Sequence, residues 1–213
     1  MDNISVIIRN KNEAEYIGFA IQSCLDFFDK PEIIVVNNNS VDESMDVVQN
    51  FNNRTDIIVE NINAYKPGES INKGVKKASN DYILVLSGHA QIIQLDLNFV
   101  KKNLEQHSAV FGKQIPVFRG KKITPGYIWS NFIDEATVNL FSEIEDRYFL
   151  HNAFCFYKKQ TLLKHPMPEE YAGKEDRFWA KSIVDKGLSF YYDPEVKCHH
   201  FWTKNGATWK GLI

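Results

Sequence analysis

The sequence predicts an α/β fold in which an open, mostly parallel sheet is flanked by helices. Short β-branched runs alternate regularly with amphipathic stretches through about the first 90 residues. Neighbouring parallel strands cannot be joined by a tight hairpin, so this alternation indicates strands that are connected through helices. The chain has 213 residues, and 44% of them are hydrophobic, which is enough for one sizeable core. We therefore expect a single domain over residues 1–213, regular over about 1–90 and less regular over about 91–213.

The regular part begins with a buried strand at residues 4–8, "ISVII", and a helix at 14–28 that carries apolar side chains at helical spacing. The same pattern then repeats, with strands and helices in alternation at 32–36, 42–51, 56–60, 70–78 and 81–86. A Pro-Gly loop, "YKPGES", stands before the last of these helices. Open α/β sheets of this kind bind their ligands at the carboxyl ends of the strands.

The less regular part begins near Leu97, where the strict alternation ends. Gly187 stands in the position that glycine favours after the C-terminus of a helix. The long stretch between 126 and 151 mixes aromatic and acidic residues, and we expect it to shape the site of a second substrate. The elements expected here are a helix at 97–105, strands at 109–118 and 153–159, a helix at 175–186 and a last strand at 189–193.

The composition excludes several partners. The 25 basic residues nearly cancel the 27 acidic ones, so the formal net charge of -2 gives no field for holding a nucleic acid. No apolar run approaches the ~20 residues that span a bilayer, and the N-terminus has no basic region followed by a hydrophobic one. Scattered cysteines without a CxxC pair fit buried thiols in a reducing compartment, at Cys24, Cys155 and Cys198. We expect a cytoplasmic protein, with peripheral contact at the inner face of a membrane left open.

Three loops rich in polar side chains follow predicted strands, at residues 9–13, 37–42 and 87–89. In a parallel sheet all three lie at one edge. Turn and helix-cap chemistry alone accounts for residues such as Ser40 and Asp42. Amides, a guanidinium and an ammonium that converge on one crevice nevertheless suit a base, a ribose and phosphates. Neither GxGxxG nor GxxxxGK[ST] is present, which excludes the dinucleotide and P-loop phosphate sites.

Four blocks of the sequence carry a family resemblance. They are, in this order, "ISVIIRNKNEAEYIGFAIQS", "EIIVVNNNSVDES", "INKGVKKASNDYILVLSGHA" and "GKEDRFWAKSIVDKGLSFYYDPEVKCHH". As a set they resemble the family-2 glycosyltransferases, which have the GT-A fold, over nearly the whole chain. The resemblance implies an inverting transfer of a sugar from a nucleotide-sugar donor to the hydroxyl of a glycan or lipid-linked acceptor, in the biosynthesis of a surface polysaccharide or glycan. It makes residues 1–90 the nucleotide-binding half and 91–213 the acceptor and catalytic-base half, and many members also need a divalent metal, Mn or Mg.

The resemblance places the nucleotide-sugar against the strand-end loops and one helix. Asn37 and Asn39 stand in the loop that usually reads "DNGSTD", where the family often has an acid that contacts the base. Asn72, in "INKG", matches a family Asn near the nucleotide, with an ordinary polar helix residue as the alternative. The implied nucleotide-binding residues are Arg9, Asn10, Lys11, Glu13, Asn37, Asn39, Asn72, Ser87 and His89.

The main departure from the family pattern is Ser87-Gly88-His89, which stands where members usually have a metal-binding DxD motif. Magnesium favours carboxylate oxygens, whereas imidazole suits other metals better. His89 therefore has three alternative roles: it binds a metal, it contacts the diphosphate in place of a metal, or it belongs to a structural turn. A histidine after the last strand can complete the family's metal shell, so the implied metal ligands are His89, His199 and His200. Because side chains alternate along a strand, only one of the last two should face the site.

The block "GKEDRFW" supplies the general base that an inverting transfer needs. Glu175 and Asp176 open a helix, where the macrodipole favours carboxylates and where acids also serve as ordinary capping residues. By resemblance Asp176 is the catalytic base and Glu175 holds the acceptor. Trp179 either stacks on a sugar or packs in the core. The alternative function is a non-catalytic nucleotide-sugar or glycan-binding protein with a degenerate DxD site.

Overall fold

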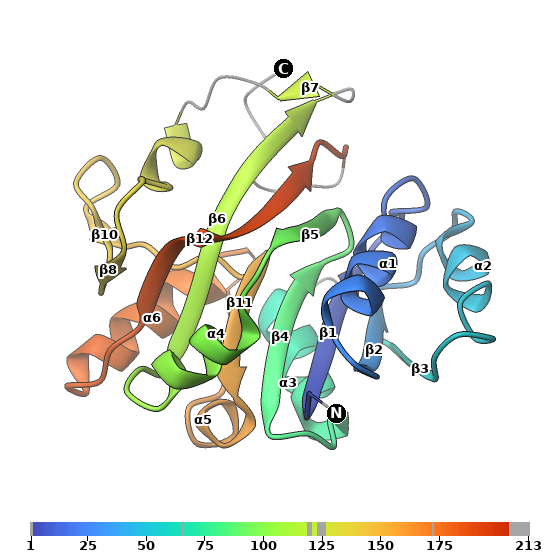
Figure 1. The fold of residues 1–213 in the computed structure, drawn as a ribbon, viewed down its shortest axis with the longest axis horizontal. Coiled ribbons are helices and arrows are strands. Elements are labelled where there is room, and N and C mark those ends of the chain that lie inside the picture. The colour runs from blue at the N-terminus through green and yellow to red at the C-terminus, as the bar shows by residue number, and fades with distance from the viewer. Residues whose placement is uncertain (1, 65, 119–120, 123–126, 172, 205–213) are drawn as a thin grey trace.

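The computed structural model describes residues 2–64, 66–118, 121–122, 127–171 and 173–204. Through these residues runs a 10-stranded sheet with helices on both faces (Figure 1). No helix in the described part of the chain is long and apolar enough to cross a membrane. The predicted fold class, an open α/β sheet flanked by helices, is confirmed.

The first half alternates strands and helices as the sequence predicts. The seven residues of β1 are nearly all buried, as expected of a strand covered on both faces. The Pro-Gly pair that was predicted to lie in a loop instead begins a helix, because proline fits the first turn, where its missing N–H has no partner to lose. The elements are β1 (Ile4–Asn10), α1 (Ile17–Phe27), β2 (Glu32–Asn37), α2 (Ser44–Gln49), β3 (Ile57–Asn61), α3 (Pro67–Lys77) and β4 (Tyr82–Ser87).

In the second half β6 has its predicted bounds, β11 is slightly shorter than predicted and the last strand extends much further, and the sequence patterns missed several elements, among them β5 and α5. The last strand continues past Pro194 to include the double histidine. The register of this strand shifts between Asp193 and Lys197, and such a bulge accommodates a residue that cannot donate to the ladder. The elements are β5 (Ala90–Gln94), α4 (Leu97–Leu104), β6 (Ala109–Phe118), β7 (Lys121–Lys122), the 3₁₀ helix η1 (Tyr127–Asn131), β8 (Thr137–Val138), β9 (Phe141–Ser142), β10 (Arg147–Tyr148), β11 (Phe154–Lys158), α5 (Lys159–Lys164), α6 (Glu175–Asp185) and β12 (Tyr191–Phe201).

The four strands of the first half pair in parallel, in the spatial order β3-β2-β1-β4. Beyond β4 the order continues β11-β6-β12-β5, in which β11 is antiparallel to both of its neighbours. Only Gly88 and His89 separate β4 from β5, yet β5 pairs with β12 at the other end of this order. The chain thus leaves the centre of the sheet at these two residues, beside the carboxyl ends of β1 and β2.

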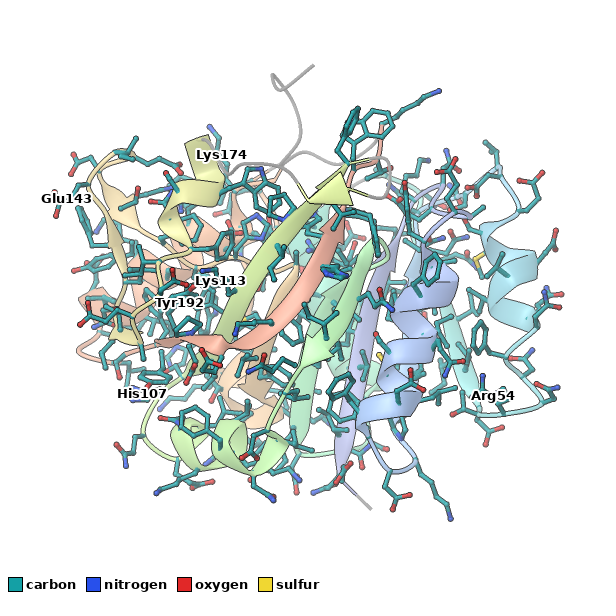
Figure 2. All side chains as sticks on the ribbon, turned by 45° about the horizontal axis from the view of Figure 1, so that its top comes forward. Arg54, His107, Lys113, Glu143, Lys174 and Tyr192 are labelled. Atoms are coloured by element: carbon teal, nitrogen blue, oxygen red, sulfur yellow. The ribbon has the colours of Figure 1, made fainter. Side chains whose placement is uncertain are left out.

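Two hydrophobic clusters hold the layers together, one on each face of the sheet. One cluster packs α1, α2 and α4 against the sheet through Ile21, Val48 and Val100. The other packs α3, α5 and α6 through residues such as Val75 and Trp179. Figure 2 shows side chains filling the space between the sheet and the helices. The sheet is therefore a fixed platform for the loops at its edges.

Candidate active site

A cavity of about 220 Å³ lies at the carboxyl ends of β1, β2 and β4. Its wall joins the first-half loops to the start of α6 and to one residue of β12. The structure brings together here nine of the predicted site residues, namely Arg9, Asn10, Lys11, Glu13, Ser87, His89, Glu175, Asp176 and His200. The parallel topology explains this convergence, because it places the ends of all these strands at one edge.

Two asparagines predicted to bind the nucleotide lie outside the wall of this cavity. Asn37 is buried, and its amide donates to Asn61 at 3.0 Å while its oxygen accepts from Asn10 at 3.3 Å. Asn39 is exposed with a φ of 46°, and its carbonyl accepts from Lys11 at 3.4 Å. The two residues therefore shape the loop after β2, and Asn38 between them is the one that lines the cavity.

Asn72 also lies away from the cavity. Its amide nitrogen donates to the Met167 carbonyl and to Glu169, both at 2.8 Å, and its oxygen accepts from the Met167 N–H at 2.9 Å. These bonds fasten α3 to the segment before α6. The alternative of a structural polar residue therefore accounts for Asn72 in this structure.

The two cations of the cavity are held by polar atoms from different elements. The Arg9 guanidinium donates to Glu175 at 3.2 Å, to the Asn152 carbonyl at 3.0 Å and to the Ser87 hydroxyl at 3.4 Å. The Lys11 ammonium donates to the Asn38 carbonyl at 2.8 Å. These contacts fix two positive charges at one corner, where an anionic phosphate group would be stabilised.

The carboxylates at the start of α6 differ in their surroundings. Glu175 is 3% exposed and is paired with Arg9, so its position is fixed. Burial, with the neighbouring Glu175 carboxylate adding to it, raises the pKa of Asp176 to about 7. A carboxyl group with a raised pKa at a cavity wall is suited to take a proton near neutral pH.

Trp179 is a core residue. It is 2% exposed, its indole N–H donates to the His165 carbonyl at 2.8 Å, and its ring meets Tyr157 edge-on at 5.2 Å between centroids. Stacking on a sugar, one of the two roles considered for this side chain, is excluded by this burial.

The imidazole of His89 is tied to the first loop. Its Nδ1 lies 3.0 Å from Glu13 Oε1, in a pair whose side chains are 13% and 4% exposed. Gly88 makes this approach possible, since a Cβ at that position would lie 3.0 Å from the Arg9 carbonyl oxygen. His89 therefore belongs to the same wall as the cations, and its ring lies 4.7 Å from that of His200 between centroids.

His200 and His151 share one amide, that of Gln114 on β6. The Ala153 N–H donates to His151 Nδ1 at 3.3 Å, so this nitrogen is an acceptor and also accepts from the Gln114 amide nitrogen at 3.0 Å. The Gln114 oxygen then accepts from His200 Nδ1 at 2.7 Å. Burial lowers the pKa of His151 to about 3, with the Arg9 charge adding to the effect, and burial also lowers the pKa of His200. Both imidazoles are therefore neutral at pH 7.

Two of the three predicted metal ligands, His89 and His200, line the cavity wall. Within the described residues there is no group of three or more His, Cys, Asp and Glu side chains placed to hold a metal ion. Of the predicted ligands, His199 packs its ring on Phe201 at 6.0 Å between centroids, whereas His200 lines the cavity, as strand alternation requires. His89 and His200 thus lie together at the cavity and His199 does not line it, and the Nδ1 atoms of His89 and His200 are both hydrogen-bonded within the protein.

If His89 contacts the diphosphate of a nucleotide in place of a metal, one of its three alternative roles, His89→Ala should weaken the binding of a nucleoside diphosphate by about 10-fold or more through the loss of one charge-assisted contact, and by the same factor with and without manganese. Titration of UDP and GDP, as two representative nucleoside diphosphates, into both proteins, in EDTA and in manganese chloride, measures the two ratios. His199→Ala is the matched control, because His199 lies on the opposite side of β12, and it should leave both affinities unchanged. A loss that appears only with manganese would instead make His89 a metal ligand.

Sequence reasoning missed several residues of the wall. His151 and Asn152 stand just before β11, which pairs with β4 and so delivers them to the same edge. The sequence pattern that could have indicated them is a polar pair directly before a predicted strand. The position of that strand in the sheet, however, does not follow from the order of elements along the chain. The other wall residues not predicted are Val36, Asn38, Pro67, Ser70 and Gly173.

Comparisons with known proteins place this geometry in context. Residues 5–165 match the family model "Glycosyl transferase family 2". A curated relative from Campylobacter jejuni, "GalNAc(5)-diNAcBac-PP-undecaprenol beta-1,3-glucosyltransferase", is 28% identical over 219 residues, which cover 98% of this chain and 68% of the relative.

Two crystal structures of S. aureus TarS 1-349 share the fold. The complex with UDP has a TM-score of 0.71 at 20% identity and covers 94% of this chain and 60% of that one. The complex with UDP-GlcNAc has a TM-score of 0.73 at 18% identity and covers 99% and 61%. The chain thus spans about three fifths of the length of these solved proteins.

Proposed function

The chain belongs to glycosyl transferase family 2, and we propose that it transfers a sugar from a UDP-sugar, with inversion, to a hydroxyl of a lipid-linked glycan. The observation that carries the proposal is the composition of one cavity wall. Two cations, Arg9 near the end of β1 and Lys11 in the loop after it, line the same space as Asp176, a carboxyl group of raised pKa. An inverting transfer needs both: positive charge for the leaving diphosphate and one base for the attacking hydroxyl.

The reaction is a single displacement. The acceptor oxygen attacks the anomeric carbon, and the bond from this carbon to the diphosphate oxygen breaks, with the electron pair leaving on the diphosphate. Asp176 takes the proton of the attacking hydroxyl. Arg9 and Lys11 stabilise the negative charge that develops on the leaving group. Attack from the face opposite the diphosphate inverts the configuration.

The choice of donor and acceptor rests on the similar proteins. The TarS structures with UDP and UDP-GlcNAc share this fold, which supports UDP as the nucleotide. The name of the Campylobacter relative supports an undecaprenol-linked glycan as the acceptor. Such an acceptor would bring the protein to a membrane surface.

Direct binding and release measurements test the proposal. In titrations of UDP, GDP, dTDP and CMP, UDP should bind at least about 10-fold more tightly than the others, since a site that hydrogen-bonds one base rejects bases that leave its polar groups unpaired. With UDP-glucose or UDP-GlcNAc and undecaprenyl-diphosphate-linked oligosaccharides, release of UDP should accompany formation of an extended glycan. Tight binding of UDP-sugars without UDP release from any donor and acceptor pair would show that the protein is a non-catalytic binder. Tighter binding of another nucleotide would overturn the assignment of UDP as the donor's nucleotide.

A further inference from the structure

Asn152 connects the two charged groups of the cavity that come from opposite halves of the chain. It is 1% exposed and stands two residues before β11. Its carbonyl accepts from Arg9 at 3.0 Å, and its side-chain nitrogen lies 3.5 Å from Glu175 Oε1. The same Glu175 oxygen accepts from Arg9 at 3.2 Å. One buried residue thus contacts both partners of the ion pair.

The orientation of the Asn152 amide is set from behind by Tyr157. The Tyr157 ring is fully buried, and its hydroxyl donates to Asn152 Oδ1 at 2.5 Å. With the oxygen facing this hydroxyl, the amide nitrogen faces the Glu175 carboxylate, to which it can donate. A flipped amide would set its oxygen against the Glu175 oxygen, so the hydroxyl and the carboxylate select the same orientation.

Arg9 depends on this arrangement for its direction. Its guanidinium contacts one acceptor on each of three segments: Ser87 at the end of β4, the carbonyl of Asn152, and Glu175 on α6. A planar guanidinium is held best when its donors meet acceptors in a fixed geometry. Movement of Asn152 would therefore change the position of Arg9 and of Glu175 together.

We propose that Asn152 and Tyr157 are positioning residues for sugar transfer, which hold Arg9 against the leaving group and Glu175 beside Asp176. This inference rests on the proposed function. Neither residue needs to touch the substrate chemically for this role, because Tyr157 acts through Asn152 and Asn152 acts through the ion pair. Misplacement of a catalytic group by a fraction of an ångström lowers the rate of the chemical step more than the affinity for substrate.

Replacing Tyr157 by Phe removes one hydroxyl and tests the first link. Tyr192 on β12, labelled in Figure 2, offers a matched control, because it is also fully buried and its hydroxyl donates to the Ile133 carbonyl at 2.7 Å. Both Tyr157→Phe and Tyr192→Phe should lower Tm by about 2–4 °C, as expected for one lost hydrogen bond in a chain of this size. Only Tyr157→Phe should lower kcat for UDP release, by about 10–100-fold, with KM for the donor nearly unchanged.

Asn152→Asp tests the second link by its pH dependence. The introduced carboxyl group faces the Glu175 carboxylate, and two carboxylates at this distance repel unless one of them is protonated. The ratio of the variant's kcat to the wild-type kcat should therefore be lowest at pH 8–9, at about one tenth or less. The ratio should rise as the pH falls towards 6, because one proton then bridges the two carboxyl groups. A purely structural loss would give a ratio independent of pH.

The outcomes separate this inference from the function on which it rests. If the wild-type protein releases no UDP from any donor and acceptor pair, the proposed function fails. If the wild-type protein is active and Tyr157→Phe behaves like Tyr192→Phe in kcat, or the Asn152→Asp ratio is flat with pH, the positioning role is overturned.

Discussion

Asp176→Asn should lower the rate of sugar transfer by about 10²–10⁴-fold, the contribution of a positioned general base, while UDP binds within about threefold of wild type. The amide cannot take the proton of the acceptor hydroxyl. The shape of the side chain is retained, so the nucleotide pocket should be unchanged. Rates of UDP release and titrations of UDP on the same preparations give both numbers.

Asp185→Asn is the matched control for this variant. Asp185 lies at the other end of α6 and pairs with Lys181 on the surface at 2.6 Å, so its replacement should leave transfer intact. If Asp176→Asn transfers sugar at the wild-type rate, Asp176 is not the general base and another residue takes the proton.

The raised pKa of Asp176 also fixes the direction of the pH effects. Because burial and Glu175 raise its pKa to about 7, wild-type transfer should increase as the pH rises through this value and the carboxyl group loses its proton. The folded state binds this proton more tightly than the unfolded chain, where an Asp has a pKa of about 3.9, so the free energy of unfolding should fall as the pH rises between these values. Asp176→Asn should therefore be more stable than wild type at pH 8 and lose this advantage near pH 4. A variant that gains stability while losing transfer marks a side chain kept for function.

Arg9→Met should lower the free energy of unfolding by about 3–5 kcal/mol, because it leaves the Glu175 charge buried without its partner. The two side chains are 14% and 4% exposed, so water can do little to replace the lost contact. The variant should also lose transfer, since the cation that faces the leaving group is gone. Urea unfolding and UDP release measure the two effects.

The double variant Arg9→Met/Glu175→Met distinguishes the two losses. Replacing a buried ion pair by apolar side chains of similar size is often nearly neutral, so the double variant should recover all but about 1–2 kcal/mol of the stability. It should not recover transfer. If the single variant is as stable as wild type, the pair is better hydrated than the structure shows, and if the double variant transfers sugar, Arg9 has no role in the reaction.

The sequence predicted the fold, and it predicted that residues from separate strand ends converge, because both follow from the order of strands and helices. His89 and Asp176, 87 positions apart in the chain by their numbers, line one cavity as a consequence of the parallel topology and of a helix start that the residue pattern indicates. Their chemical roles stay predictions. The halves 1–90 and 91–213 also stay an expectation, since the sheet runs through both without a break.

The differences between the predicted residues and those that line the cavity have local causes. The direction of a loop side chain depends on backbone angles that no periodicity reports, which is why Asn38 rather than Asn39, with its φ of 46°, lines the cavity. His151 and Asn152 were missed because β11 inserts beside β4 in the antiparallel sense, and the chain order does not show this insertion. Asn72 has a helical position that the family pattern matched, but its hydrogen bonds to Met167 and Glu169 could only be seen in three dimensions.

The separation of β4 from β5 has a consequence for synthesis on the ribosome. While the chain is growing, the first four strands can form a parallel sheet with β4, "YILVLS", at its edge. One row of backbone N–H and C=O groups of β4 then has no partner strand until β11 has been made. In the same way β5 has no partner until β12, the last strand of the described residues, has been made. Long-range pairings of this kind form slowly, and an uncovered apolar edge is prone to join another chain. Nascent chains that stall before residue 154 are therefore the ones we expect to aggregate, and the cavity is completed only after β12, which carries His200, has been made.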